Sequence, residues 1–172
     1  MSSILTDDII NINTNNLNDR VSYGNNNEII FLKILKNINT DFKKIQYVYS
    51  KLDYVLTYTN NKNTGGCPDE RSFGQPPNNI YIELKTRTIT INKFNTTIFP
   101  VGKLEYFNSL GKNNELYICY GFIDDIDNKI INFYFIKYNK TIFSTFNITT
   151  IFNKIHFEIP INLLQPFKYF NI

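Results

Sequence analysis

Residues 80–87, IYIELKTR, decide the fold, because they place an acid and a lysine inside a run that otherwise reads as a buried strand. Successive side chains of a β-strand point to opposite faces of the sheet. Glu83 and Lys85 therefore share one face, while Ile82 and Leu84 share the other. The stretch predicts a central strand that deliberately carries one polar face.

The segments around this strand predict a mixed α/β fold. The pattern over 26–38 predicts an amphipathic helix capped by Asn27 or a neighbour. Residues 45–58 predict two short strands joined by a bend near Ser50, and residues 99–111 predict a turn and a helix that ends near Gly111. The apolar positions expected on the first helix are Ile29, Ile30, Leu32, Ile34 and Leu35, and the longer strands are expected over 80–91, 115–125, 129–138 and 153–164.

This order of helix, strands, helix and strands predicts an α/β protein with a mixed central β-sheet flanked by helices. A chain of 172 residues suits a single domain over 1–172, with a polar segment over 1–25 and carboxy-terminal strands over 123–172. Its 42% hydrophobic and 16% aromatic content argues against disorder.

Composition excludes several classes of protein. Cys67, Cys119 and His156 are isolated, so the sequence does not predict a zinc site, and His156 is expected to be structural or exposed. The acidic start lacks the basic region of a signal peptide, and no apolar run reaches membrane-spanning length. We expect an intracellular protein of cytoplasm or nucleus, not secreted and without a membrane partner. The abundance of Asn, Ile, Lys and Tyr is typical of an AT-rich genome and compatible with a viral origin.

The acid-x-lysine pattern by itself is a weak signal, and three copies occur. Those at Asp41 and Asp127 lie in polar connections, where charges are solvated. Only Glu83-Leu84-Lys85 lies within an apolar strand, where charges must pair, reach solvent or bind an ion. One interpretation is an edge or half-exposed strand whose outer face carries a Glu–Lys pair.

A second interpretation brings in Asp53, which lies at the start of the strand expected over 52–58. If this strand pairs with 80–86 as a hairpin, Asp53 and Glu83 come together. Two adjacent carboxylates repel unless they share a cation, and hard oxygen ligands suit Mg²⁺ or Mn²⁺. Lys85 is then the local positive charge.

These residues resemble the PD-(D/E)xK nuclease superfamily, over about residues 28–122. The resemblance implies a restriction-endonuclease-like core of a helix, a three-stranded antiparallel unit, a second helix and a further strand. It implies that Asp53, Glu83 and the Leu84 carbonyl hold the metal and that Lys85 positions or activates the attacking water. An additional acid on the first helix corresponds to Glu28.

Two further points concern this resemblance. Asp69, which follows Pro68, is an alternative metal acid, but its neighbours GGCP and ERSFGQPP do not supply a rigid strand, so we prefer Asp53. Arg87 and Lys103 are expected to contact phosphate, with surface charge as the alternative for each.

The function expected is a metal-dependent endonuclease that hydrolyses phosphodiester bonds in DNA, with a homodimer suited to double-strand cleavage. A formal charge of +3 and a pI near 8.7 permit a polyanionic partner without requiring one. The first rival is a non-catalytic nucleic-acid-binding or scaffold module in which Glu83 and Lys85 form an ion pair. The second is a β-rich protein-interaction domain.

Overall fold

The computed structural model describes residues 17–44, 52–57, 79–111, 113–127 and 131–171. Its helices are α1 (Leu17–Ile38), α2 (Val101–Ser109) and the short α3 (Lys140–Phe143), with 3₁₀ turns η1 (Ile91–Lys93), η2 (Ile161–Leu163) and η3 (Phe167–Tyr169). Its strands are β1 (Lys43–Lys44), β2 (Tyr54–Thr57), β3 (Asn79–Thr90), β4 (Thr96–Pro100), β5 (Asn114–Ile123), β6 (Ile131–Lys137), β7 (Ile148–Ile151), β8 (Lys154–Pro160) and β9 (Gln165–Pro166).

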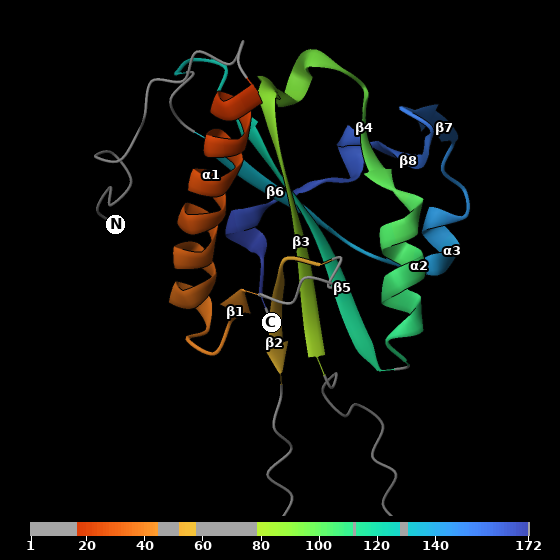
Figure 1. The fold of residues 1–172 in the computed structure, drawn as a ribbon, viewed down its shortest axis with the longest axis horizontal. Helices are drawn as coiled ribbons and strands as arrows, with labels where there is room; N and C mark the ends of the chain where they lie inside the picture. The colour runs from red at the N-terminus through yellow and green to blue at the C-terminus, as the bar shows by residue number, and fades with distance from the viewer. Residues whose placement is uncertain (1–16, 45–51, 58–78, 112, 128–130, 172) are drawn as a thin grey trace, which may run out of the picture.

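The larger sheet has six strands in the order β1-β2-β3-β5-β6-β9 (Figure 1). Its neighbours are antiparallel except β3 and β5, which run parallel. Parallel neighbours need a long crossover, and here the segment that contains β4 and α2 supplies it. The fold is therefore α/β with a mixed sheet, as the order of elements predicts.

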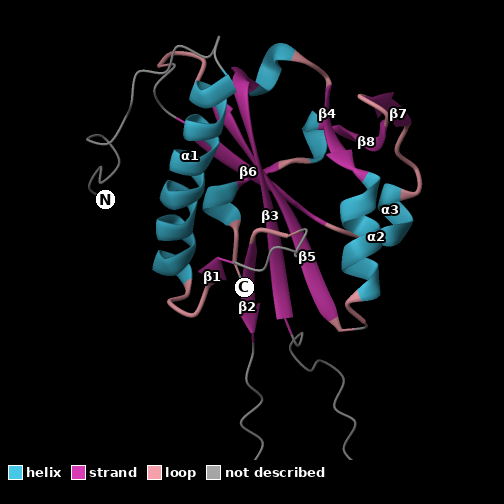
Figure 2. Ribbon diagram, in the orientation of Figure 1, coloured by secondary structure: helices cyan, strands magenta, loops and turns pink. Residues whose placement is uncertain are grey.

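A smaller sheet, in the order β4-β8-β7, lies beside α2 and α3 (Figure 2). The β7–β8 hairpin turns through Phe152 and Asn153, whose φ angles of 48° and 59° are left-handed. Two consecutive left-handed residues give a two-residue turn that matches the twist of the paired strands. Because β4 leads directly into α2, this sheet fixes where α2 begins.

The larger sheet buries apolar side chains on both faces, with α1 covering one face and α2 the other (Figure 1). Alternation along β5 shows this division: Tyr117 and Cys119 face α1, whereas Ile118 and Tyr120 face α2. The carboxy-terminal aromatic residues close the α1 side, where Phe167 packs edge-on against Phe31 with ring centroids 5.1 Å apart. A strand that is buried on both faces has no room for a charged side chain unless partners meet it there.

Several sequence expectations about the elements are wrong. The first helix starts at Leu17, not residue 26, so Asn27 is a buried interior residue and not its cap. Among its described side chains, over 23–38, Phe31 and Leu35 are fully buried, while Ile29 is 55% exposed. Packing on the sheet stabilises this helix despite an Asn-rich first half with poor helix propensity.

The expected turn before α2 is also wrong, because Phe99 and Pro100 end β4 and the helix follows without a gap. Gly111 follows α2 with a φ of 96°, the left-handed conformation that suits glycine after a helix end. Of the two strands expected over 45–58, the second appears as β2. The expected first strand and the bend near Ser50 fall on residues 45–51, which lie outside the described part of the chain, and β1 precedes that range.

Candidate metal and phosphate site

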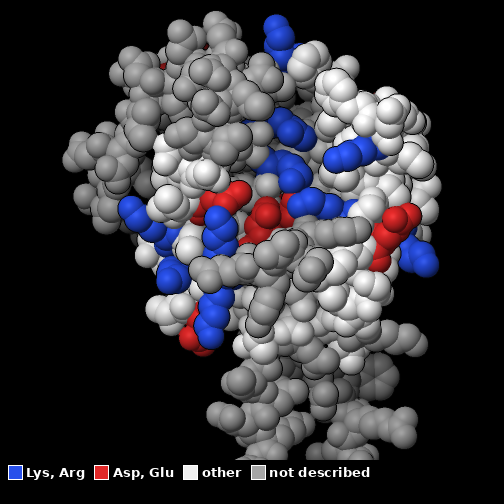
Figure 3. Space-filling model, viewed as in Figure 1, with Lys and Arg blue, Asp and Glu red and all other residues white. Residues whose placement is uncertain are grey.

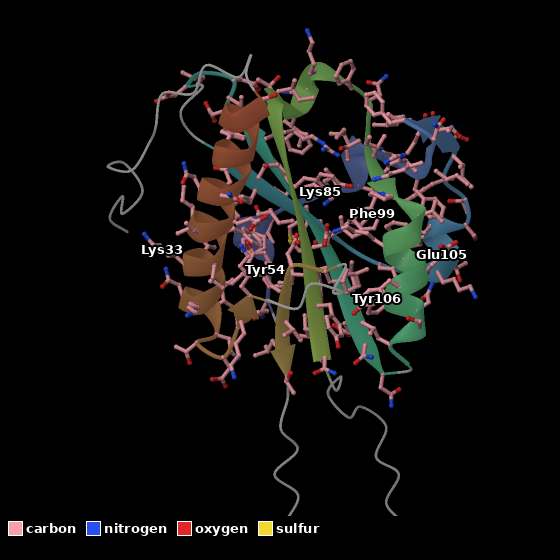
Figure 4. The ribbon with its side chains drawn as sticks, in the orientation of Figure 1. Lys33, Tyr54, Lys85, Phe99, Glu105 and Tyr106 are labelled. Carbon is pink, nitrogen blue, oxygen red and sulfur yellow. The ribbon has the colours of Figure 1, made fainter. Side chains whose placement is uncertain are left out.

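The site lies on β3, which occupies the interior of the larger sheet between antiparallel β2 and parallel β5. An edge position for this strand is therefore wrong. Ile82 and Leu84 pack in the core on the α1 side, while Tyr81 packs in the core on the α2 side. Glu83 and Lys85 share the face of Tyr81 by alternation. Figure 4 shows Lys85 on the side of β3 toward α2 and Tyr54 on the side toward α1.

Glu83 is the chemical centre of this face, and its side chain has no exposed surface. Its Oε1 accepts hydrogen bonds from two ammonium groups: Lys85 Nζ at 2.5 Å, and Lys103 Nζ from the first turn of α2. Its Oε2 is buried and has no hydrogen-bond partner in the described part of the chain. One oxygen therefore accepts two hydrogen bonds, while the other accepts none from the described residues.

The electrostatics of Glu83 follow from this setting. Burial is the largest influence and Asp53 the second, and together they raise the pKa of Glu83 from 4.5 to about 7. Lys85 and Lys103 lower it, but they do not cancel the desolvation of the carboxylate. A further positive partner, such as a cation, would favour the charged form of Glu83.

The structure brings Asp53 to Glu83 from the neighbouring strand. Asp53 directly precedes β2, whose Tyr54 pairs with Ile82, so the next pair toward the site is Asp53 with Glu83. The Leu84 backbone N–H donates to Asp53 Oδ2 at 2.8 Å, which fixes this carboxylate at the end of the strand. The N–H and C=O of a strand residue point to the same edge. The Leu84 carbonyl therefore also lies on the Asp53 side.

The oxygen donors at this position fit a divalent cation. They comprise two carboxylates, one with an unpartnered buried oxygen, and a backbone carbonyl on the same strand edge. Mg²⁺ and Mn²⁺ prefer oxygen ligands, and Mg²⁺ commonly binds through one or two carboxylates while keeping several waters. The described residues contain no group of three or more His, Cys, Asp or Glu side chains that would bind a metal without such help.

Glu28 differs from the other acids in its contacts. Its Oε2 binds Lys44 Nζ at 2.5 Å, and its backbone carbonyl accepts from the Tyr54 hydroxyl at 2.9 Å. Burial, followed by Glu28 and Asp53, raises the pKa of Tyr54. Tyr54 thus connects α1 to the strand that carries Asp53, while the Glu28 carboxylate is bound on the Lys44 side.

Arg87 continues the polar face of β3 but is held differently. Its Nη2 donates to the Ile98 carbonyl at 3.1 Å, and its guanidinium lies 5.8 Å from the centroid of the Tyr120 ring. Burial lowers its pKa. The Tyr120 hydroxyl donates to the same Ile98 carbonyl at 3.1 Å. Sequence reasoning did not identify this cluster, because nothing in the local pattern places β4 over β3 and β5.

The contact between Lys103 and Glu83 was also not anticipated, since the sequence indicates only that Lys103 lies near a helix start. Figure 3 shows basic side chains gathered around a small acidic group in the middle of the face between α1 and α2. Asp69 and Cys67 lie outside the described residues. His156 is buried with Nδ1 2.9 Å from the Lys154 carbonyl oxygen, which agrees with a structural role, and Cys119 is a buried free thiol.

No family model matches the chain, and neither the curated proteins nor the solved structures contain a significant match. Within the described ranges, no helix is both long and apolar enough to cross a membrane. The geometry around Glu83 is therefore the feature of the chain that bears on its function.

Proposed function

We propose that the protein is a metal-dependent nuclease of the PD-(D/E)xK type that hydrolyses phosphodiester bonds in DNA. The observation that carries this proposal is Glu83: a fully buried carboxylate beside Asp53, with one oxygen bound by two lysines and the other without a partner. A strand in the middle of a sheet carries such a group at considerable cost, and strongly perturbed acids of this kind concentrate at functional sites.

The order of elements supports a restriction-endonuclease-like core. The described chain runs through α1, the antiparallel set β1, β2 and β3, then α2 and a further strand, β5. This is the order that the resemblance to the superfamily implies. β4 is an addition that belongs to the smaller sheet.

In this proposal, Asp53 and Glu83 hold Mg²⁺ or Mn²⁺ with the Leu84 carbonyl. The chemistry that such an ion supplies when bound is activation of a water and stabilisation of charge on the phosphate. Glu83 also keeps the Lys85 ammonium beside the carboxylates, where it orients the attacking water and stabilises negative charge that develops in the transition state. Burial of both faces of β3 fixes these groups on a rigid element.

The direct test is incubation of the purified protein with plasmid, single-stranded and branched DNA in Mg²⁺ or Mn²⁺. Cleavage is expected, with complete loss in a chelator and a loss of about a hundredfold or more in Lys85→Ala. Lys93→Ala, which removes an exposed lysine in η1, serves as the matched control and should keep wild-type activity. Thermal unfolding of each variant excludes loss of the fold as the cause. Equal activity in Lys85→Ala and wild type would remove this mechanism.

One observation favours the non-catalytic module as the second candidate: Lys85 and Lys103 already neutralise Glu83 without a metal. This candidate predicts salt-sensitive DNA binding with no calorimetric signal for Mn²⁺, whereas the nuclease predicts Mn²⁺ binding that Asp53→Asn weakens. Calorimetry of wild type and this variant therefore separates the two functions even if the DNA substrate is chosen badly.

A further inference from the structure

Two lysines share one oxygen of Glu83, although one would suffice for an ion pair. Lys85 lies two residues along the same strand, so its backbone fixes it beside Glu83. Lys103 reaches the same Oε1 from α2, twenty residues away in the sequence. These two ammonium groups together balance the charges of Glu83 and Asp53. The formal charges of these four side chains therefore sum to zero before any metal binds.

A divalent cation would change this balance. With two further positive charges beside Asp53 and Glu83, both lysines would face excess positive charge at close range, where Coulomb repulsion is strong. Lys85 stays near because it belongs to β3. Lys103 is free to leave, because its side chain is 23% exposed and its ammonium ends a flexible four-carbon stem on the first turn of α2.

We propose that Lys103 is a stand-in counter-ion that holds Glu83 until the metal binds and then moves to a backbone phosphate of the DNA. Lys103 would thereby link metal loading to substrate binding, because the protein gains a phosphate contact only in its metal-bound state. This inference rests on the proposed metal site. It goes beyond it by giving Lys103 two successive partners, Glu83 first and phosphate second.

Removal of Lys103 then has an unusual consequence for metal binding. The metal-free protein loses a counter-ion from a buried carboxylate pair, whereas the metal-bound protein loses nothing at this position. Linkage therefore predicts that Lys103→Met binds Mn²⁺ about tenfold or more tightly than wild type, as measured by calorimetry. If Lys103 merely positioned Glu83 as a metal ligand, Lys103→Met would bind Mn²⁺ more weakly than wild type.

The second readout is the salt dependence of DNA binding. Each phosphate contact adds about 0.9 to the slope of log affinity against log salt. For wild type and a labelled duplex between about 50 and 200 mM salt, the slope should steepen by about one when Ca²⁺ replaces a chelator. Lys103→Met should show no such change, and Lys103→Arg, which keeps the charge, should restore it. Lys140→Met, which removes an exposed lysine of α3, should behave as wild type.

Equal or weaker Mn²⁺ binding by Lys103→Met would overturn the inference, as would a wild-type slope that Ca²⁺ leaves unchanged. The slope of wild type needs no variant, so the second result stands even if Lys103→Met does not fold. Failure of the proposed function looks different: wild type and all variants would show no Mn²⁺ signal and no cleavage. Cleavage that persists with an unchanged slope would leave the nuclease and remove only the role of Lys103.

Discussion

A buried glutamate in the middle of a sheet is tolerated here because ammonium groups from two elements bind it. Lys85 comes from the same strand and Lys103 from α2, while Asp53, directly before β2, adds a second negative charge nearby. Breaking a buried ion pair typically costs about 3–5 kcal/mol, because one charge remains buried without compensation. Lys85 and Lys103 therefore help to keep the Glu83 carboxylate charged inside the protein, whereas Asp53 opposes that charge.

The pKa of Glu83 predicts how the metal-free protein responds to pH. Since folding raises this pKa from 4.5 to about 7, the folded state holds the proton more tightly than the unfolded chain. The resulting stability is fully present below about pH 4.5 and is lost as pH rises through about 7. At about 1.4 kcal/mol per pH unit, the whole change amounts to about 3 kcal/mol.

The measurement is the free energy of unfolding of wild type and Glu83→Gln from about pH 4.5 to about pH 8, with a chelator present. The glutamine variant lacks this titration but keeps the other ionisable groups. Wild type should lose about 3 kcal/mol relative to the variant as pH rises. Parallel curves would mean that Glu83 titrates alike in the folded and unfolded states.

At the level of elements, Gly121 of β5 shows how closely the side chains of the adjacent strand β6 pack against it. A Cβ at Gly121 would lie 2.9 Å from Ile131 Cγ2 and 3.0 Å from a ring atom of Phe133, both on β6. The Ile131 methyl and the Phe133 ring cannot move far to make room for this added Cβ. Gly121→Ala should therefore destabilise the protein by about 1–3 kcal/mol, as overpacked cores do.

Gly102, in the first turn of α2, is the matched control for this substitution. A Cβ there would meet only Glu105 Oε2, at the ordinary contact distance of 3.9 Å. Because alanine suits a helix better than glycine, Gly102→Ala should be neutral or stabilise by up to about 1 kcal/mol. Denaturant unfolding of both variants tests the pair, and equal effects would contradict the contact argument.

How much of the fold could be predicted from the sequence depended on the length and burial of each element. The long strands β3, β5 and β6 carry continuous apolar or alternating patterns, and these were predicted well. The four-residue β7 is half exposed and was missed, as was β4, whose Phe99 and Pro100 resemble a turn. The first half of α1 lacks a local helix signal, because its stability comes from the sheet it covers.

The candidate site could also be predicted only in part. Pairing of β2 with β3 follows from their adjacency in the sequence, and it places Asp53 beside Glu83 without knowledge of the rest of the fold. The partner of Lys103 depends on where the crossover sets α2 over the sheet, which no local pattern encodes. Arg87 shows the same limit, since its acceptor belongs to a strand of the other sheet.

At the scale of the whole molecule, the two ends of the described chain meet through aromatic rings. Phe31 of α1 is fully buried and has Phe167 of η3 at 5.1 Å and Phe133 of β6 at 4.9 Å between ring centroids. The carboxy-terminal segment is thus part of the core that holds α1 against the sheet. Its removal would expose the Phe31 ring on the side that Phe167 covers.

A double-mutant cycle tests this closure. Phe31→Ala should cost about 3–5 kcal/mol, because it leaves a cavity among buried rings. Phe167→Ala should also destabilise, and the two losses should be coupled by about 0.5–1.5 kcal/mol, as expected for packed aromatic pairs. Phe152→Ala, at a ring that is 94% exposed, is the control and should change stability by less than about 0.5 kcal/mol. Strict additivity of the first two variants would contradict direct packing.

The Ile98 carbonyl, which accepts from both Arg87 and Tyr120, also affects how α2 is placed on the larger sheet. These two hydrogen bonds link β4 of the smaller sheet to β3 and β5 of the larger one, only five residues before Lys103. Because α2 follows β4 directly, these bonds also fix the start of the helix that carries Lys103. Replacing Arg87 would remove one of these hydrogen bonds and would shift Lys103 relative to Glu83, although neither of those two residues is changed.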